Sequence, residues 1–219
     1  MNFLMIDRLS KLYPKDNIEA LKRVTFSVSE GEVVAIMGPS GCGKSTLLNM
    51  IGALDRPTSG DISINGRLIR EYGPAHLFRA RMIGFVFQFH HMVSGMTLAE
   101  NVAAPLVAQG IGKHERMIRA MELLENVGLE HRAHFLPSRV SGGERQRAAV
   151  ARSLVATPKI ILADEPTGNL DSSAGEAVFQ LMLTHSRDKG ATVIIATHNA
   201  EIAGLCDRTI TMRDGCIIN

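Results

Sequence analysis

The 219-residue chain has the composition of a globular protein, with 45% apolar and 21% charged residues, and its length suits one large domain or a compact body with a small satellite. Its net charge of +2 argues against a dedicated nucleic-acid binder, and no apolar run approaches the roughly 20 residues of a membrane helix. The N-terminus lacks a secretory signal, and three widely spaced cysteines favour free thiols over disulfides.

Strand-like and helical patterns alternate along the chain, which predicts an α/β fold with a parallel sheet covered by helices. Residues 33–37 read as a buried strand, followed by a glycine-rich turn and a helix from about Lys44 to Leu54. Residues 60–69 alternate around Asn65-Gly66, the signal for a two-residue hairpin turn of type I′. We therefore expect a small antiparallel element beside the parallel core.

The middle of the chain has a different character. After a strand at residues 83–88, the sequence reads as helical, with a capping box from Thr97 to Glu100 and Gly128 closing the next helix. Strands return at residues 160–163, 192–197 and 208–212. We expect a core of residues 1–88 and 157–219, carrying the small antiparallel element, and an inserted helical subdomain of residues 89–156.

The run GPSGCGKST at residues 38–46 has the spacing of a phosphate-binding loop and lies between a predicted strand and a predicted helix. Its glycines bring backbone N–H groups against phosphate oxygens, and the helix N-terminus adds a positive dipole. Lys44 is expected to reach the β and γ phosphates, Ser45 to offer its hydroxyl to Mg²⁺, and Thr46 to bond an α or β phosphate oxygen. The predicted nucleotide contacts are Gly38, Pro39, Ser40, Gly41, Cys42, Gly43, Lys44, Ser45 and Thr46.

Two acids, Asp164 and Glu165, follow the predicted strand at residues 160–163, and ligands gather at the carboxyl ends of strands in such sheets. Successive residues at a strand end point in different directions. We therefore expect Asp164 to hold hydrated Mg²⁺ and Glu165 to polarise the attacking water. His198 ends the strand at residues 192–197 in the same way, which suggests that it senses the γ phosphate. Outside this context, all three side chains would be ordinary surface caps.

A second glycine motif, VSGGERQR at residues 140–147, opens a long helix behind the N-cap Ser141. A chain that binds one nucleotide gains little from two anion-binding helix ends, so the second is expected to serve a nucleotide held by another molecule. Across essentially its full length, the sequence resembles the ATP-binding subunits of ABC transporters. The resemblance rests on Gln88, the SGG signature, the EPTGNLD run at residues 165–171 and His198, in the family's order after the phosphate loop.

The resemblance implies a P-loop NTPase core of the RecA-like type that binds ATP and Mg²⁺ and hydrolyses ATP. Tyr13, expected after a short strand, corresponds to the aromatic residue that stacks on adenine. Gln88 corresponds to the glutamine that links Mg²⁺ and water to the transport subunit. The implied catalytic residues are Lys44, Gln88, Glu165 and His198, and the implied Mg²⁺ ligands are Ser45, Gln88 and Asp164.

The signature residues Ser141, Gly142 and Gly143 resemble those that contact ATP on the opposite subunit, and Asp171 matches an aspartate that crosses the dimer interface. Glu144 stands where many members carry glutamine, but this change removes no phosphate-binding N–H. The resemblance thus implies a second copy of the chain in a head-to-tail dimer, integral membrane transport subunits and no nucleic acid as partner. It places the protein at the cytoplasmic face of the inner (plasma) membrane, as a peripheral subunit.

Within the family, the run QFHHMVSGM from Gln88 looks like the ATPase of lipoprotein-releasing transporters, with macrolide export and cell division as related branches. Phe89, Met92 and Met96 in this run are predicted to contact the membrane subunits; for Phe89 and Met92, ordinary helix packing is the alternative explanation. The run lacks an expected proline, so the cargo stays open, as do the transport direction and whether the chain is an excised domain. A DNA-acting ABC ATPase would carry a long coiled coil before the signature, and a small-molecule kinase would lack SGG and Asp171.

Overall fold

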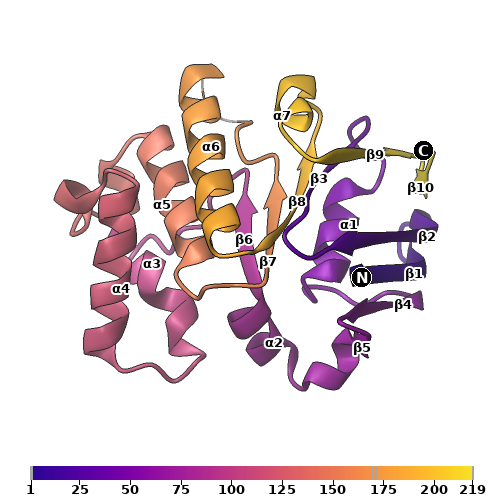
Figure 1. Ribbon diagram of the computed structural model, residues 1–219, viewed down its shortest axis with the longest axis horizontal. Helices are drawn as coiled ribbons and strands as arrows, with labels where there is room; N and C mark the ends of the chain where they lie inside the picture. The colour runs from indigo at the N-terminus through magenta and orange to yellow at the C-terminus, as the bar shows by residue number, and fades with distance from the viewer. Residues whose placement is uncertain (1, 169, 171, 219) are drawn as a thin grey trace.

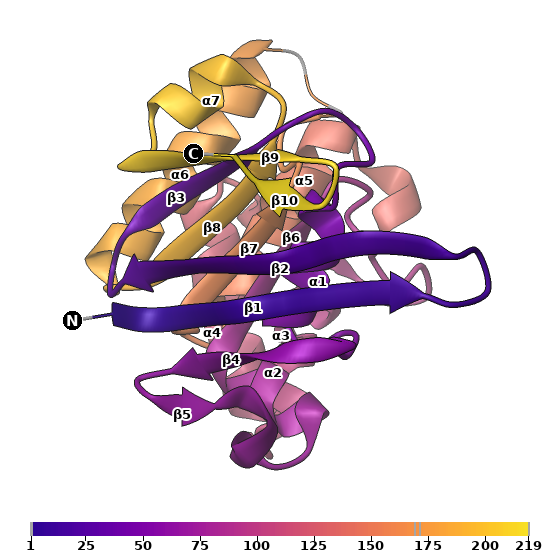
Figure 2. The ribbon, with the colours of Figure 1, turned by 90° about the vertical axis from the view of Figure 1, so that its right-hand side faces the viewer.

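The structure, a computed structural model, describes residues 2–168, 170 and 172–218. It contains a six-stranded sheet in the order β10-β9-β3-β8-β7-β6 and a four-stranded sheet in the order β2-β1-β4-β5 (Figures 1 and 2). The strands are β1 Asn2–Tyr13, β2 Ile18–Ser29, β3 Val33–Met37, β4 Ser59–Ile64, β5 Arg67–Leu68, β6 Ile83–Phe87, β7 Ile160–Asp164, β8 Thr192–Thr197, β9 Arg208–Arg213 and β10 Cys216–Ile217. The helices are α1 Lys44–Ile51, α2 Ala75–Met82, α3 Leu98–Val107, α4 Lys113–Asn126, α5 Gly142–Leu154, α6 Ser172–Asp188 and α7 Ala200–Gly204, with 3₁₀ turns at Ile69–Tyr72, Glu130–Arg132 and Pro137–Arg139.

The central sheet separates two apolar cores. Strands β9, β3, β8, β7 and β6 are parallel, and all six residues of β8 are buried, as expected for a sheet covered on both faces. Alternate strand residues face opposite sides, so Leu162 packs with Leu47 of α1 and Ile161 packs with Phe179 of α6. Consequently α1 covers one face, while α5 and α6 cover the other. The predicted α/β fold with a parallel sheet is confirmed.

The antiparallel sheet packs on the far side of α1. Leu4 and Ile64 belong to the same core as Leu47, and Figure 2 shows β1, β2 and β4 crossing in front of the central strands. The expected hairpin turn is present, since Asn65 and Gly66 both have positive φ, of 49° and 75°.

The expected small antiparallel element is confirmed, but its first strands are longer than predicted. The sequence prediction placed one short strand before Tyr13, whereas β1 and β2 each span twelve residues. Their pairing register shifts between Ile6 and Leu9, and Arg8 and Arg23 have positive φ. Such bulges reset which side chains face inward, so the simple alternation that identifies a strand is broken.

Residues 89–159, all described, contain no strand, in agreement with the helical character read from the sequence. Thr97 caps α3, its hydroxyl accepting from the Glu100 N–H and the Glu100 carboxylate accepting from the Thr97 N–H. The next helix, α4, ends just before Gly128, whose φ is +68°. In Figure 1, α3 and α4 lie on the side of the molecule away from β1, β2 and β4, around an apolar core of their own.

Helix α1 ends at Ile51, three residues earlier than predicted. Gly52 follows it and fits closely against the ring of Phe85, since a Cβ at Gly52 would lie 2.7 Å from Phe85 Cε1. The described part of the chain holds no helix with both the length and the apolarity needed to cross a bilayer.

Candidate functional site

The loop between β3 and α1 is formed by residues that need glycine. A Cβ at Gly38 would lie 2.7 Å from Cys42 Sγ, and one at Gly43 would lie 3.2 Å from Leu21 Cδ2. Gly43 has a φ of 107° at the N-cap of α1, and no side chain caps this end of the helix. The N-terminal N–H groups of α1 therefore have no side-chain cap, and their binding of phosphate stays a prediction.

Lys44 is buried at the start of α1, with 8% of its surface exposed. Its ammonium donates to the carbonyl of Gly38 at 2.7 Å and to that of Pro39 at 3.1 Å. These two hydrogen bonds tie the Lys44 side chain to the backbone of the loop and place its ammonium group inside the loop.

The carboxyl ends of β3, β7 and β8 bring the predicted acids to the phosphate-binding loop. Asp164 accepts a hydrogen bond from Ser45. Burial raises the pKa of Asp164 above its ordinary value; the charge of Glu165 adds to this rise, while the Ser45 bond and the Lys44 charge oppose it. The structure therefore gathers Lys44, Ser45 and both acids at one edge of the sheet.

Glu165 and His198 are in direct contact. Glu165 Oε1 lies 2.8 Å from Nδ1 of His198, and the Glu165 side chain is 17% exposed against 70% for the histidine. Thr197 donates to the second carboxylate oxygen at 3.4 Å. Glu165 has a φ of 46°, which takes the chain out of β7 and carries the carboxylate to the end of β8.

Gln88 and Tyr13 lie on other segments. Gln88 follows β6 and lies beside Gly168, where a Cβ would be 3.0 Å from Gln88 Nε2. Tyr13 is the last residue of β1; its hydroxyl donates to Asp55 at 3.1 Å, and the ammonium of Lys11 lies 4.8 Å from its ring centroid. The adenine contact of Tyr13 stays a prediction.

Ser141 caps α5, as predicted from the signature. Its hydroxyl accepts from the Glu144 N–H at 3.2 Å, while the Glu144 carboxylate accepts from the Ser141 N–H at 2.7 Å. Because α5 and α1 cover opposite faces of the central sheet, Gly142 and Gly143 lie across the sheet from the chain's own phosphate-binding loop. Asp171 lies outside the described residues.

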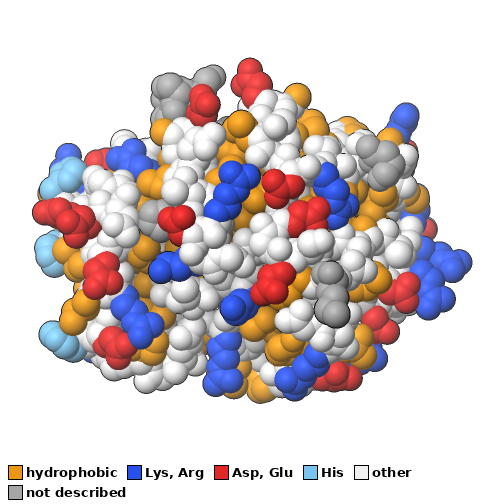
Figure 3. Space-filling model, in the orientation of Figure 1, with side chains coloured by type: hydrophobic (Ala, Val, Ile, Leu, Met, Phe, Trp, Pro, Cys, Tyr) orange, Lys and Arg blue, Asp and Glu red, His pale blue; other side chains and the backbone are white. Residues whose placement is uncertain are grey.

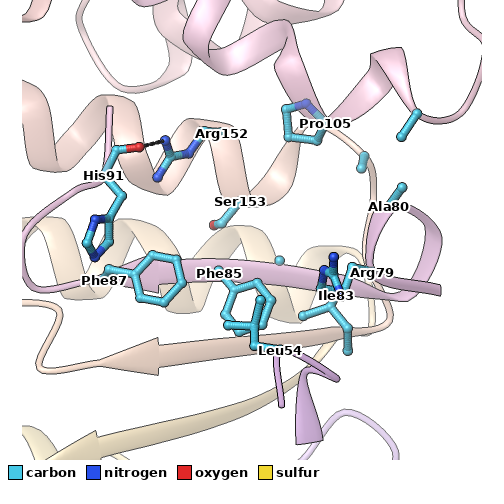
Figure 4. Close-up of a pocket in the computed structure, with 13 residues that line it drawn as sticks. Leu54, Arg79, Ala80, Ile83, Phe85, Phe87, His91, Pro105, Arg152 and Ser153 are labelled. Carbon is cyan, nitrogen blue, oxygen red and sulfur yellow. Dashed lines mark hydrogen bonds between the residues drawn. The ribbon is translucent and has the colours of Figure 1, made fainter. Parts of the chain in front are cut away.

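Two functional candidates were not predicted from the sequence. Arg152 is a polar residue inside α5 that no motif marks, and Gln146 lies within the run at residues 140–147 but was assigned no role. Arg152 lines a cavity of about 310 Å³ between the core and the helical region, and it donates to the carbonyl of His91 at 2.7 Å (Figure 4). The floor is apolar, with Phe85 and Phe87 stacked at 5.2 Å. Gln146, almost fully buried, donates to a carbonyl beside Glu165.

On the face shown in Figure 3, basic and acidic side chains are interspersed, with apolar side chains between them. This face of the described chain therefore has no large patch of like charges that could steer a charged ligand.

The profile of the family described as ABC transporter matches residues 21–168. The chain is also 45% identical over 203 residues to the lipoprotein-releasing system ATP-binding protein LolD of Geobacter metallireducens, covering 92% of this chain and 90% of that protein. The chain belongs to the ABC transporter family. As the ATP-binding subunit of an ABC transporter, it is an ATPase.

Solved ABC cassettes share the fold over almost the whole chain. The dimeric ATP-binding cassette MJ0796, in a post-hydrolysis state bound to ADP and Pi, is 39% identical with a TM-score of 0.90, covering 99% of this chain and 97% of its own. CbiO1 of Clostridium perfringens, part of the transporter complex cbiONQ, is 31% identical with a TM-score of 0.86, covering 100% and 87%. These similarities confirm the ABC ATPase fold expected from the sequence.

Proposed function

We propose that the chain powers a lipoprotein-releasing ABC transporter by hydrolysing ATP with Mg²⁺ at the edge formed by Lys44, Ser45, Asp164 and Glu165. The gathering of these four side chains beside the phosphate-binding loop carries the proposal. The similarity to LolD supports the branch of the family. The subunit would lie at the cytoplasmic face of the inner membrane, bound to integral membrane transport subunits.

The donor set fits Mg²⁺, because Ser45 and Asp164 offer hard oxygen atoms already joined by a hydrogen bond. The raised pKa of Asp164 reflects a buried carboxylate that lacks sufficient positive charge, which a cation supplies. Gln88 would complete the set. When bound, Mg²⁺ neutralises charge on the β and γ phosphates.

The chain's own groups perform the remaining steps. Lys44 exchanges its loop carbonyls for phosphate oxygens, which compensate its charge better than neutral carbonyls do. Glu165 accepts a proton from the attacking water at its carboxylate. His198 holds that carboxylate through its Nδ1, and its ring, which is largely exposed, would contact the γ phosphate.

A second copy completes the site. Helix α5, which begins with the signature, packs on the opposite face of the central sheet from α1, which supports a site in which a head-to-tail partner supplies Ser141, Gly142 and Gly143. The dimeric state of the similar cassette MJ0796 supports this arrangement.

Exposed apolar residues after Gln88 mark the surface for the membrane subunits. Phe89 is 71%, Val93 50% and Met96 40% exposed. Met92, by contrast, packs partly against the helical core, and its sulfur lies 3.9 Å from Arg152. His91 of the same segment lines the cavity of Figure 4, which supports a membrane-subunit contact formed by this segment and the cavity beside it.

The test of ATP hydrolysis is Glu165→Gln, which keeps the shape of the side chain and removes its charge. Turnover should fall by about 10²–10⁴-fold while ATP affinity survives. Blocked turnover should also let ATP accumulate a dimer in light scattering, and adding Ser141→Arg should abolish that dimer. If Glu165→Gln turns over ATP at the wild-type rate, Glu165 is not the base. If the variant stays monomeric at high concentrations of protein and ATP, the composite site is contradicted.

The membrane surface is tested separately. Alanine at Phe89, Val93 and Met96 should reduce co-purification of membrane subunits from detergent extracts while ATP binding by the isolated chain is unchanged. The co-purified subunits and their cargo identify the branch: release of a lipid-modified protein supports the proposal, and a macrolide or a cell-division partner contradicts it.

A further inference from the structure

Gln146 lies inside α5, less than two turns from the signature, and is 2% exposed. Its Nε2 donates to the carbonyl of Pro166 at 2.6 Å. Its Oε1 is buried and accepts no hydrogen bond from the described residues. Burying a glutamine with one amide atom unsatisfied costs free energy. The hydrogen bond that its Nε2 donates is therefore the feature that explains a glutamine at this position.

The accepting carbonyl belongs to the residue directly after Glu165. On its other side, the Glu165 N–H donates to the Ala196 carbonyl of β8 at 2.9 Å. The backbone of Glu165, held at a φ of 46°, therefore spans two anchors, one on β8 and one on α5. A shift of α5 relative to the sheet would act on Glu165 through Gln146 and Pro166.

The same helix contacts the following segment at its N-terminus. A Cβ at Gly143 would lie 3.7 Å from Leu170 Cδ2, so Gly143 of the signature lies close to Leu170, whose N–H donates to the Thr167 carbonyl at 3.0 Å. Helix α5 thus has one end available to the partner's nucleotide and its flank bonded to the segment that carries the chain's own carboxylate.

We propose that Gln146 is a positioning residue. It fixes the position of the Glu165 carboxylate in its own subunit according to where that subunit's helix α5 lies. The inference rests on the proposed function, in which Glu165 is the base and α5 binds the partner's ATP. Each site in the dimer would then assemble its base only when the neighbouring site holds its nucleotide.

The first test replaces Gln146 by methionine, which keeps the length of the side chain and removes the donor. kcat should fall about tenfold or more, because small displacements of a reacting group are costly, while KM for ATP stays within about twofold. The melting temperature should change by less than about 3 °C, since the loss of the Pro166 bond is offset by removal of the unsatisfied Oε1. Gln109→Met is the matched control: Gln109 also donates to a carbonyl at 2.6 Å, that of Ala80, and kcat should be unaffected.

Gln146→Glu provides a second variant with the same shape. Its carboxylate cannot donate to Pro166, but its protonated form can, so the deficit in kcat relative to wild type should narrow as the pH falls. A deficit that is independent of pH, or a normal kcat in both variants, would overturn the proposal.

Mixed dimers, purified through two different tags, separate action within a subunit from action across the interface. One copy carries Glu165→Gln, so turnover comes from the site of the other copy. Gln146→Met should slow turnover when it is on the copy with the intact Glu165, and should have no effect on the Glu165→Gln copy. If Gln146→Met slows turnover only on the Glu165→Gln copy, or slows it equally on either copy, positioning within the subunit is refuted. Failure of the proposed function is distinct: wild-type protein would then show no ATP hydrolysis.

Discussion

Replacing Gly84 by alanine tests how tightly β6 is held against α5. A Cβ at Gly84 would lie 3.0 Å from both the Ser153 carbonyl carbon and Pro158 Cγ, and nearer still to the Ser153 oxygen. Ordinary contact begins at 3.4 Å, so strand and helix must separate by more than about 0.4 Å, because the Ser153 oxygen is closer than the two atoms at 3.0 Å. Overpacking of this kind costs about 1–3 kcal/mol, which for a chain of this size lowers the melting temperature by about 2–12 °C.

Gly204→Ala provides the control for this substitution. Gly204 ends α7, and a Cβ there would meet no atom within 4 Å. Alanine should therefore leave the melting temperature unchanged, or raise it because helix propensity adds up to about 1 kcal/mol of stability. Thermal unfolding followed by circular dichroism compares both variants with wild type. If Gly84→Ala melts together with or above Gly204→Ala, the close approach of β6 and α5 is not a constraint on this fold.

Two further substitutions test the site edge and the loop before α3. Asp164→Asn should raise the melting temperature at neutral pH. Burial raises the pKa of Asp164, so the stability of the wild-type protein falls as the pH rises from the ordinary aspartate pKa through the raised pKa, and asparagine removes this loss. This gain should vanish in calorimetry below the ordinary aspartate pKa; a gain that persists there contradicts the pKa assignment. Asn101→Ala should cost about 2–4 kcal/mol in urea unfolding, because its buried amide bonds the backbone of Val93, Met96 and Thr97; a loss below about 1 kcal/mol would show that the loop is held by other contacts.

The parts of the fold that were predictable are those whose signals are local. Strands β3 and β8 appear with the predicted bounds because each is a continuous apolar run that both faces of the sheet bury. The N-caps Thr97 and Ser141 were predictable because a capping box satisfies its own backbone within four residues.

The parts that escaped prediction depend on contacts between distant segments. Bulges such as the one at Arg8 are set by pairing between strands and break the alternation within each one. The contact between Glu165 and His198 joins the ends of two strands, and the bond from Gln146 joins a helix to a loop twenty residues later. The sequence places such residues at the right edge of the sheet, but their partners depend on the three-dimensional packing.

The placement of α1 and α5 on opposite faces of the central sheet has a kinetic consequence. If each ATP site combines α1 of one copy with α5 of another, as proposed, a single chain cannot complete a site, so in dilute solution the rate of turnover per volume should rise with the square of the protein concentration. Membrane subunits that hold two copies side by side would replace this dependence with a fixed effective concentration. Idle copies away from the membrane would then consume little ATP, without any inhibitor to restrain them.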